Sequence, residues 1–287
     1  MPDMSKMISF QGAPGANSDM ACRDAYPNMT PLPCRTFSEA FGAVRSGEAE
    51  LGMIPIENSV AGRVADIHHL LPESGLHIVG EYFLRINFHL FGVPGATMAD
   101  ITHVHSHIHA LPQCSKFITE HGFEPVVHAD TAGAAADVAK WGDKTQAAIS
   151  ASLAGELYDL NSVAQDVEDA DHNTTRFIIM AREPRIPDPS EENLMTTFVF
   201  RVRNIPAALY KAMGGFATNG INMTKLESYL RGDFVAAQFY ADVEGHPEQQ
   251  GLKNALEELR FFTHSVDLLG TYPAHKYRLE QMGSHGD

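Results

Sequence analysis

The sequence predicts an α/β protein in two parts: a region of alternating strands and helices, followed by a smaller unit in the ferredoxin-like order βαββαβ. Two observations support this prediction. Short apolar runs alternate with helical patterns over residues 1–183, and the order of elements changes after residue 193. The segment between them, 184–193, has three prolines and no apolar periodicity, so we interpret it as a linker.

The first region is expected to form a mostly parallel sheet built from βαβ units. Its predicted strands are Met7–Phe10, Leu51–Ile56, one or more within Ile78–Val93, Ala147–Ile149 and Thr175–Met180, and its predicted helices begin near Ser18, near Val64 and at the alanine-rich Thr131–Lys140. A region of about 180 residues is long enough to divide into two α/β lobes with a cleft between them.

The second region, 194–287, contains four predicted strands and two predicted helices. They are strand Thr196–Val202, helix Pro206–Asn219, strands Ile221–Leu230 and Phe234–Val243, helix Pro247–Phe262 and strand Val266–Thr271. Pro206 suits a first helical turn, and Asn219-Gly220 suits a helix stop.

Composition indicates a globular protein of the cytoplasm. The 287 residues are 44% hydrophobic and 20% charged, and the three cysteines have no Cys-x-x-Cys spacing, which argues against a disulfide framework or zinc ribbon. The first residues have no signal-peptide pattern, and no apolar run approaches the ~18 residues of a membrane span. We therefore expect no membrane association.

The formal charge of −15 is unevenly distributed. Residues 1–193 carry 12 Lys and Arg against 26 Asp and Glu, a net of −14, and residues 194–287 carry 9 against 10, a net of −1. A nucleic-acid partner is not expected, because phosphate binding needs a basic surface. An anionic small substrate must therefore be held by local donors.

Polar residues follow the first two predicted strands. Gly12–Ser18 leads from a strand into a helix, where backbone N–H groups can hold an anion, although a plain tight turn also explains it. Asn58 and Ser59 follow a buried strand, at the edge where α/β sheets bind ligands, and helix capping by Ser59 is the alternative.

Four histidines alternate with other residues, and in a strand they would share one face. They are His103, His105, His107 and His109. This spacing suggests a metal site, but no second cluster of Cys or acidic ligands completes a known pattern, so no metal is expected.

A hydroxyl and a guanidinium are adjacent at the start of the last strand of the first region. Thr175 and Arg176 precede the apolar run Phe177–Met180. Arginine offers a planar fork of donors to a carboxylate, and threonine adds one donor or acceptor beside it. The sequence thus indicates chemistry on an acid, with a surface arginine opening a strand as the alternative.

Five ordered blocks together resemble the prephenate dehydratase family over essentially the whole chain. The blocks are Phe10-Gln11-Gly12 with Gly15–Ser18, Pro55–Ser59, Ser106-His107 with Gln113-Cys114, Asp130–Ala132 and Asn173–Phe177. The resemblance implies two lobes like those of periplasmic binding proteins, with the active site between them, and a C-terminal ACT regulatory domain at 194–287.

The resemblance also implies an activity: conversion of prephenate to phenylpyruvate, water and carbon dioxide, without metal or organic cofactor, in phenylalanine biosynthesis. Thr175 corresponds to the family's catalytic threonine, with Arg176 beside it. The substrate-binding residues implied are Asn58, Ser59, Ser106, Thr131, Asn173 and Phe177.

The resemblance further implies phenylalanine as an allosteric ligand of the ACT domain. The implied site includes Ala207, Ala208, Leu209, Glu227 and Ser228. The family's Gly-Ala-Leu is Ala-Ala-Leu here, and its Glu-Ser-Arg-Pro is Glu-Ser-Tyr-Leu, so weaker inhibition is expected. A small βαββαβ unit with open sheet edges favours a symmetric homodimer or homotetramer.

Two other functions remain open from the sequence. Arogenate dehydratase acts on a substrate with an amino group in place of the keto group, and nothing in the sequence decides between the two substrates. A non-catalytic sensor of carboxylates or amino acids would use the same fold, but it would bind without releasing carbon dioxide.

Overall fold

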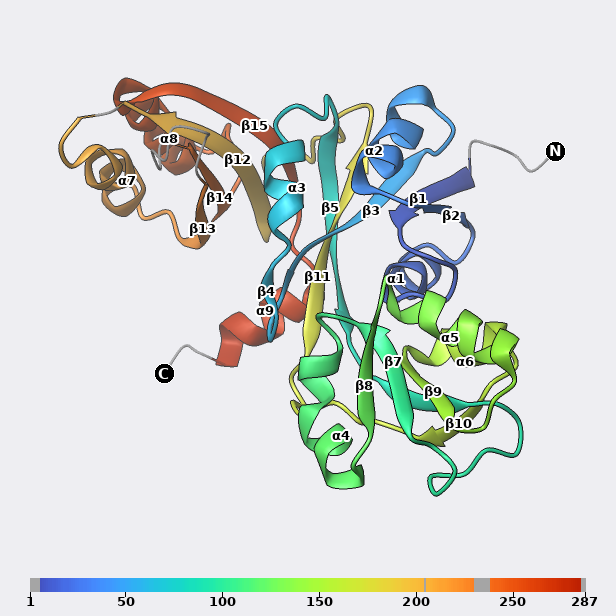
Figure 1. The fold of residues 1–287 in the computed structure, drawn as a ribbon. Helices are drawn as coiled ribbons and strands as arrows, with labels where there is room; N and C mark the ends of the chain where they lie inside the picture. Colours follow the sequence, from blue (N-terminus) through green and yellow to red (C-terminus); the bar gives the residue numbers. More distant parts are fainter. Residues whose placement is uncertain (1–5, 204, 230–237, 285–287) are drawn as a thin grey trace. The chain divides into compact units, whose positions relative to one another are not determined.

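The structure is a computed structural model that describes residues 6–203, 205–229 and 238–284 (Figure 1). The elements are β1 Met7–Gln11, α1 Asn17–Ala25, β2 Thr30–Cys34, α2 Phe37–Ser46, β3 Leu51–Asn58, β4 Gly62–Arg63, α3 Ala65–Leu70, β5 His77–Arg85, β6 His89–Gly92, β7 His103–His107, the 3₁₀ helix η2 Leu111–Cys114, α4 Ser115–His121, β8 Glu124–His128, α5 Thr131–Trp141, β9 Gln146–Ser150, α6 Ser152–Leu157, β10 Asn161–Ala164, β11 Thr174–Ala181, β12 Leu194–Val202, α7 Ala208–Thr218, β13 Met223–Tyr229, β14 Gln238–Glu244, α8 Gln250–Phe262, β15 Thr263–Pro273 and α9 Lys276–Ser284. Within these ranges, every helix is too short or too polar to cross a lipid bilayer.

The chain forms two compact units, and two of the three limits between them fall inside strands, β5 and β11. One comprises Met1–Val64 and Tyr82–Phe177, and the other Ala65–Glu81 and Ile178–Asp287. The second unit therefore takes in α3 and the first half of β5 as well as the C-terminal elements. The predicted linker at 184–193 lies wholly within the second unit.

The first sheet has the order β2-β1-β3-β11-β5, with β4 added to β3. Strand β1 pairs in parallel with both β2 and β3. The three central residues of β1 and the first four of β3 are buried. Both faces of the sheet are therefore covered there, as the continuous apolar run of β3 predicts. Asn58 is the last residue of β3, and Thr174 is the first of β11.

The second sheet has the order β10-β6-β9-β7-β8 and is mixed, with β7 parallel to β8 and β9 and with β6 antiparallel to β9 and β10. The predicted alanine-rich helix is confirmed as α5. The Asp130 side chain caps its start by accepting from the Gly133 N–H, and Gly142 ends it in the left-handed conformation (φ 66°). Its small buried side chains pack in the core beside β6 and β9.

The apolar run Ile78–Val93 forms two strands in two different sheets, β5 in the first and β6 in the second. Between the two strands, hydrogen bonds with residues 166–173 hold the backbone in place. The Ile86 N–H donates to the Asn173 carbonyl (2.8 Å), and the Phe88 N–H donates to the Glu168 carboxylate (2.8 Å). Apolar periodicity alone does not show this change of partner.

The C-terminal sheet has the order β13-β14-β12-β15, with every pair antiparallel. Helices α7 and α8 pack on one face of it (Figure 1), over a core that includes Phe198, Phe200 and Phe216. The predicted ferredoxin-like βαββαβ order is thus confirmed, and α9 is an addition that the sequence did not predict. The predicted strand ends at Leu230 and Phe234 lie outside the described residues.

Candidate active site

The end of β3 is fastened to the start of β11 by Ser59. Its N–H donates to the Thr174 carbonyl (2.9 Å), and its hydroxyl donates to the His172 carbonyl (2.8 Å) and accepts from the Thr174 N–H (2.9 Å). These bonds fix the ends of the two strands side by side. They also occupy the Ser59 hydroxyl, which therefore serves the backbone in this structure.

The Asn58 side chain connects the end of β3 to Thr175 by hydrogen bonds. Its carbonyl oxygen accepts from the N–H groups of Val60 (2.9 Å) and Ala61 (2.7 Å), which fixes the orientation of the amide. Its NH₂ group therefore points the other way and donates to Asn173 Oδ1 (2.7 Å) and Thr175 Oγ1 (2.9 Å). The Thr175 oxygen is thus an acceptor, and its own proton stays available for donation.

Asn58 is the first of three side-chain amides joined by hydrogen bonds, which we call the amide chain. Its second member, Asn173, is only 1% exposed. The Asn173 NH₂ donates to Gln113 Oε1 (2.6 Å), and the Gln113 NH₂ donates to the His109 carbonyl (2.5 Å). Every side-chain amide is held by a neighbour, so the position of Asn58 is set over several residues. A hydroxyl that accepts such a bond becomes a better donor through polarisation.

A pocket of about 340 Å³ lies beside this chain. Its lining residues are Val60, Ala61, His109, Pro112, Gln113, Asp169, Ala170 and Asn173. Asn173 and Gln113 thus belong both to the pocket wall and to the amide chain that holds Thr175. The volume suits a small metabolite.

Arg176 lies away from Thr175. Neighbouring residues of a strand point to opposite faces, and the Arg176 guanidinium pairs with Glu57 Oε1 (3.0 Å) while only 2% of its side chain is exposed. In this structure the guanidinium therefore serves an ion pair, and a joint role of Thr175 and Arg176 stays a prediction. Phe177 is 1% exposed and belongs to the core.

The remaining predicted substrate-binding residues, Ser106 and Thr131, lie in the second sheet and its helix. Ser106 is fully buried and donates to the Ile149 carbonyl (2.6 Å), whereas half-buried Thr131 is the first residue of α5. Direct side-chain bonds therefore join Asn58, Asn173 and Thr175, and Ser59 bonds to the backbone of His172 and Thr174 beside them. Sequence reasoning had not assigned Gln113 to the site, although it stands in one of the blocks that carry the resemblance.

A family model described as prephenate dehydratase matches residues 8–185, which include every residue of this arrangement. The chain belongs to the prephenate dehydratase family. It is 54% identical over 274 residues to a bifunctional N-acyl-homoserine lactone acylase/prephenate dehydratase of Komagataeibacter europaeus, with 95% of this chain and 98% of that protein covered.

Two further comparisons extend the likeness. Arogenate dehydratase/prephenate dehydratase 2 of Arabidopsis thaliana is 37% identical over 276 residues, covering 93% of this chain and 72% of that protein. The crystal structure of prephenate dehydratase in complex with L-Phe from Arthrobacter aurescens is 30% identical, covers 93% of this chain and 89% of that one, and superposes with a TM-score of 0.84.

The loop Gly12–Ser18, one of the blocks that resemble the family, binds an anion of its own chain. The Gly15 N–H donates to the buried Asp19 carboxylate (2.8 Å), which also pairs with Arg23. Gly15 has a φ of 89°, and a Cβ there would lie 2.9 Å from the Ala154 Cα. Close packing and backbone conformation therefore both explain this glycine.

His103, His105 and His107 lie on β7, whereas His109 lies beyond its end. His103 lies 3.3 Å from Glu124, His105 bonds to Gln146 (2.7 Å), and the rings of His107 and His109 are 5.1 Å apart. Over the described ranges, no group of three or more His, Cys, Asp or Glu side chains is arranged to hold a metal ion. Burial lowers the pKa of His107, and nearby His109 lowers it further against the opposing effect of Asp130.

The residues expected to bind an effector lie where α7 and β13 begin and end. Ala207 precedes α7 in the left-handed conformation (φ 58°, ψ 27°), Ala208 begins the helix, and Leu209 packs against the core. In β13, Glu227 lies 3.5 Å from the Lys225 ammonium, and Ser228 is exposed. Glycine would adopt the left-handed backbone at 207 more readily than alanine does.

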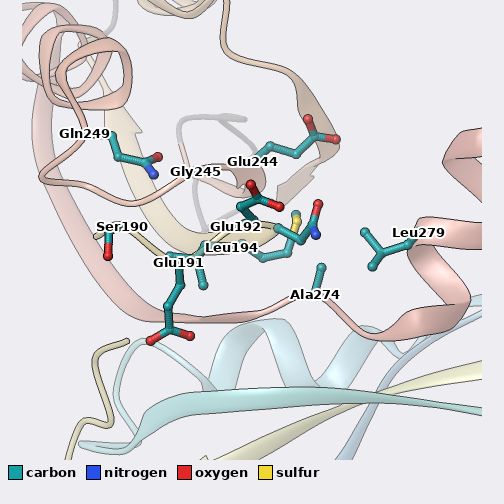
Figure 2. Close-up of a pocket in the computed structure, with 11 residues that line it drawn as sticks. Ser190, Glu191, Glu192, Leu194, Glu244, Gly245, Gln249, Ala274 and Leu279 are labelled. Carbon is teal, nitrogen blue, oxygen red and sulfur yellow. The ribbon is translucent and has the colours of Figure 1, made fainter. Parts of the chain in front are cut away.

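A second pocket, of about 410 Å³, lies at the other end of the C-terminal sheet (Figure 2). Three glutamates contribute to its lining, Glu191, Glu192 and Glu244, and Leu279 of α9 and Ala274 lie at one side. Among the described residues that line it, none is Lys, Arg or His. This pocket is therefore unsuited to an anionic substrate or to the carboxylate of an amino acid.

Proposed function

We propose that this protein is a prephenate dehydratase, which converts prephenate to phenylpyruvate, water and carbon dioxide. The observation that carries the proposal is the Thr175 hydroxyl, which accepts from Asn58 and so keeps its proton for a ligand. The leaving group of prephenate is a hydroxide, which needs such a proton donor. The experiment is to incubate the protein with prephenate and measure phenylpyruvate and carbon dioxide.

The proposed step needs little from the protein beyond placement and one donor. As the C–O bond to the ring hydroxyl breaks, the Thr175 proton moves toward the departing oxygen. The bond from the ring to its carboxylate breaks at the same time, and its electron pair completes the aromatic ring as carbon dioxide leaves. Threonine then recovers its proton from solvent, so one proton is taken up for each prephenate and no net oxidation occurs.

The two carboxylates of prephenate require different treatment. Tight binding of the ring carboxylate would stabilise charge that disappears as carbon dioxide forms, and would raise the barrier. The side-chain carboxylate stays charged, and we assign it to Arg176. This assignment requires Arg176 to leave its ion pair with Glu57 and to reach the face of β11 that carries Thr175.

The alternative substrate is arogenate, which carries an amino group where prephenate has a keto group. The Arabidopsis relative is named for both substrates. The same protein sample assayed with each substrate decides the preference through the ratio of the two kcat/KM values. A carboxylate sensor would bind either compound and release no carbon dioxide.

A second activity is favoured by the relative from Komagataeibacter europaeus, whose name includes N-acyl-homoserine lactone acylase. The two proteins are 54% identical over nearly the whole of this chain. We therefore propose to test whether this protein hydrolyses the amide bond of an N-acyl-homoserine lactone, which gives a fatty acid and homoserine lactone. The Thr175→Val variant then shows whether both activities depend on one hydroxyl. Loss of dehydratase activity with full acylase activity would place the second reaction elsewhere.

We also propose that the βαββαβ unit is an ACT-type module through which phenylalanine inhibits the enzyme. The Arthrobacter aurescens relative was solved in complex with L-Phe, and the first turn of α7 offers backbone N–H groups for a carboxylate beyond that of Ala208, which donates to the Ile205 carbonyl (3.2 Å). Calorimetry on the full chain and assays at millimolar phenylalanine test this. No heat of binding and no loss of activity would reject it.

Assembly into an even-numbered homo-oligomer is proposed for the same unit. Strands β13 and β15 are the edges of its sheet, and pairing of copies would cover such edges. Light scattering at micromolar concentration is expected to give at least twice the monomer mass of 31.4 kDa. A monomer would contradict it.

A further inference from the structure

Glu81 lies in β5 with its carboxylate closed to solvent. The side chain is 0% exposed, and that of its partner Arg278 is 12% exposed. Arg278 grips both oxygens, with Nε 2.9 Å from Oε1 and a terminal nitrogen 2.7 Å from Oε2. The His275 N–H adds a third bond to Oε1 (3.1 Å). A buried carboxylate is stable only with such partners, and here they come from the segment after β15.

A second contact fixes the same two parts of the chain. A Cβ at Gly270 would lie 2.0 Å from the Ile78 carbonyl oxygen, so the backbone of β15 rests directly on the backbone of β5. Ile78 is three residues before Glu81. The C-terminal segment is therefore attached to β5 at two points, which explains why residues Ala65–Glu81 group with the C-terminal unit.

At its other end, β15 reaches the region where phenylalanine is expected to bind. Val202, the last residue of β12, pairs with Thr263, the first of β15, and the Arg203 N–H donates to the Phe262 carbonyl (3.2 Å). The 11 residues of β15 span roughly 35 Å. One strand thus runs from the neighbourhood of Ala207 to the attachment at Glu81.

Strand β5 in turn leads to the active site. It ends at Arg85, and the next N–H, that of Ile86, donates to the Asn173 carbonyl (2.8 Å). Asn173 is the central amide of the chain that holds Asn58 and Thr175. A shift of β5 along its length therefore acts on the backbone of a residue that positions the proton donor.

We propose that the Glu81–Arg278 ion pair is the connection through which phenylalanine bound to the βαββαβ unit changes the active site. Glu81 and Arg278 are positioning residues that act through β5 on Asn173. The inference rests on the proposed feedback inhibition and identifies its route. The same segment also forms one side of the pocket in Figure 2, through Ala274 and Leu279.

The test compares Arg278→Lys and Glu81→Gln with the wild type. Lysine keeps the charge but lacks the fork, and glutamine keeps the size but has one acceptor oxygen in place of two. Arg23→Lys is the matched control, because it alters a pair between a guanidinium and a buried carboxylate within α1 that shares no residue with the Glu81–Arg278 ion pair. The assay is kcat/KM for prephenate with and without saturating phenylalanine, with calorimetry of phenylalanine binding to the full chain.

Both variants are expected to bind phenylalanine within about threefold of the wild type. The ratio of kcat/KM without phenylalanine to that with it should fall at least threefold toward one, and the control should keep the wild-type ratio. A structural defect alone would weaken binding and inhibition together. An unchanged ratio in both variants, or a parallel loss in the control, overturns the inference.

Hydrogen exchange at the Ile86 amide gives a readout independent of turnover. Phenylalanine should change its protection in the wild type and in Arg23→Lys, and leave it unchanged in Arg278→Lys and Glu81→Gln. A wild type that neither turns over prephenate nor responds to phenylalanine overturns the proposed function and the inference with it. Equal responses in the wild type and both variants overturn the inference alone.

Discussion

Replacing Thr175 by valine removes one hydroxyl and keeps the shape of the side chain. In the structure this hydroxyl accepts a bond of 2.9 Å from Asn58, and its proton is available to a ligand. Two effects therefore follow from one substitution. The Asn58 amide loses an acceptor in the folded protein, and the leaving hydroxide loses its proton donor during the reaction.

The two effects differ in size. An unpaired N–H on half-buried Asn58 costs about 1 kcal/mol of unfolding free energy, since solvent reaches part of the residue. Loss of a donor that serves the transition state costs about 3 kcal/mol of activation free energy, or roughly 10²-fold in kcat. We expect kcat to fall by about that factor with KM nearly unchanged.

The assay is steady-state formation of phenylpyruvate, with urea unfolding as the measure of stability. Thr175→Ser restores the hydroxyl and should recover most of kcat. Thr174→Val is the matched control, because Thr174 is the preceding residue of β11 and its side chain points to the other face. Turnover of Thr175→Val within about threefold of the wild type would refute the reasoning.

Arg176→Lys should raise KM for prephenate more than it lowers kcat, because a point charge replaces the planar fork of guanidinium donors. An unchanged KM with a lower melting temperature would show that Arg176 serves only its ion pair with Glu57. Ala207→Gly should raise the unfolding free energy by about 1 kcal/mol and strengthen phenylalanine inhibition, because glycine adopts the left-handed backbone at 207 without strain; equal urea midpoints for the two proteins would contradict it. The pKa of His107 is lowered in the folded protein, so the unfolded chain takes up the proton first as pH falls below about 6.5. The free energy of unfolding should therefore fall with pH in that window, and fall less steeply in His107→Gln. Urea titrations at pH 7.5 and 5.5 check this, and an equal change in unfolding free energy for the two proteins would contradict it.

Features fixed by local chemistry could be predicted from the sequence. The alanine-rich helix starts at an Asp cap and ends at a left-handed glycine, and the βαββαβ order follows from apolar runs separated by helix starts and stops. Partners distant in sequence could not be predicted. The apolar run Ile78–Val93 reads as one pattern but forms strands of two different sheets. The chain passes from one sheet to the other where its N–H groups bond to Glu168 and Asn173.

The candidate site shows the same limit. Adjacency in sequence suggested that Thr175 and Arg176 act together, but strand alternation turns them to opposite faces, and Glu57 pairs with the guanidinium. Gln113 reaches Asn173 across 60 residues, which no local pattern indicates. The hydroxyl itself was predicted, whereas the amide chain that orients it required the structure.

The most direct test of the account is the stoichiometry of prephenate turnover. The purified protein is incubated with prephenate, and separately with arogenate, while the aromatic product and carbon dioxide are measured. The account predicts one phenylpyruvate and one carbon dioxide per prephenate consumed, a higher kcat/KM for prephenate than for arogenate, and about 10²-fold slower turnover by Thr175→Val. Binding of prephenate without release of carbon dioxide, or equal turnover by Thr175→Val, would contradict it.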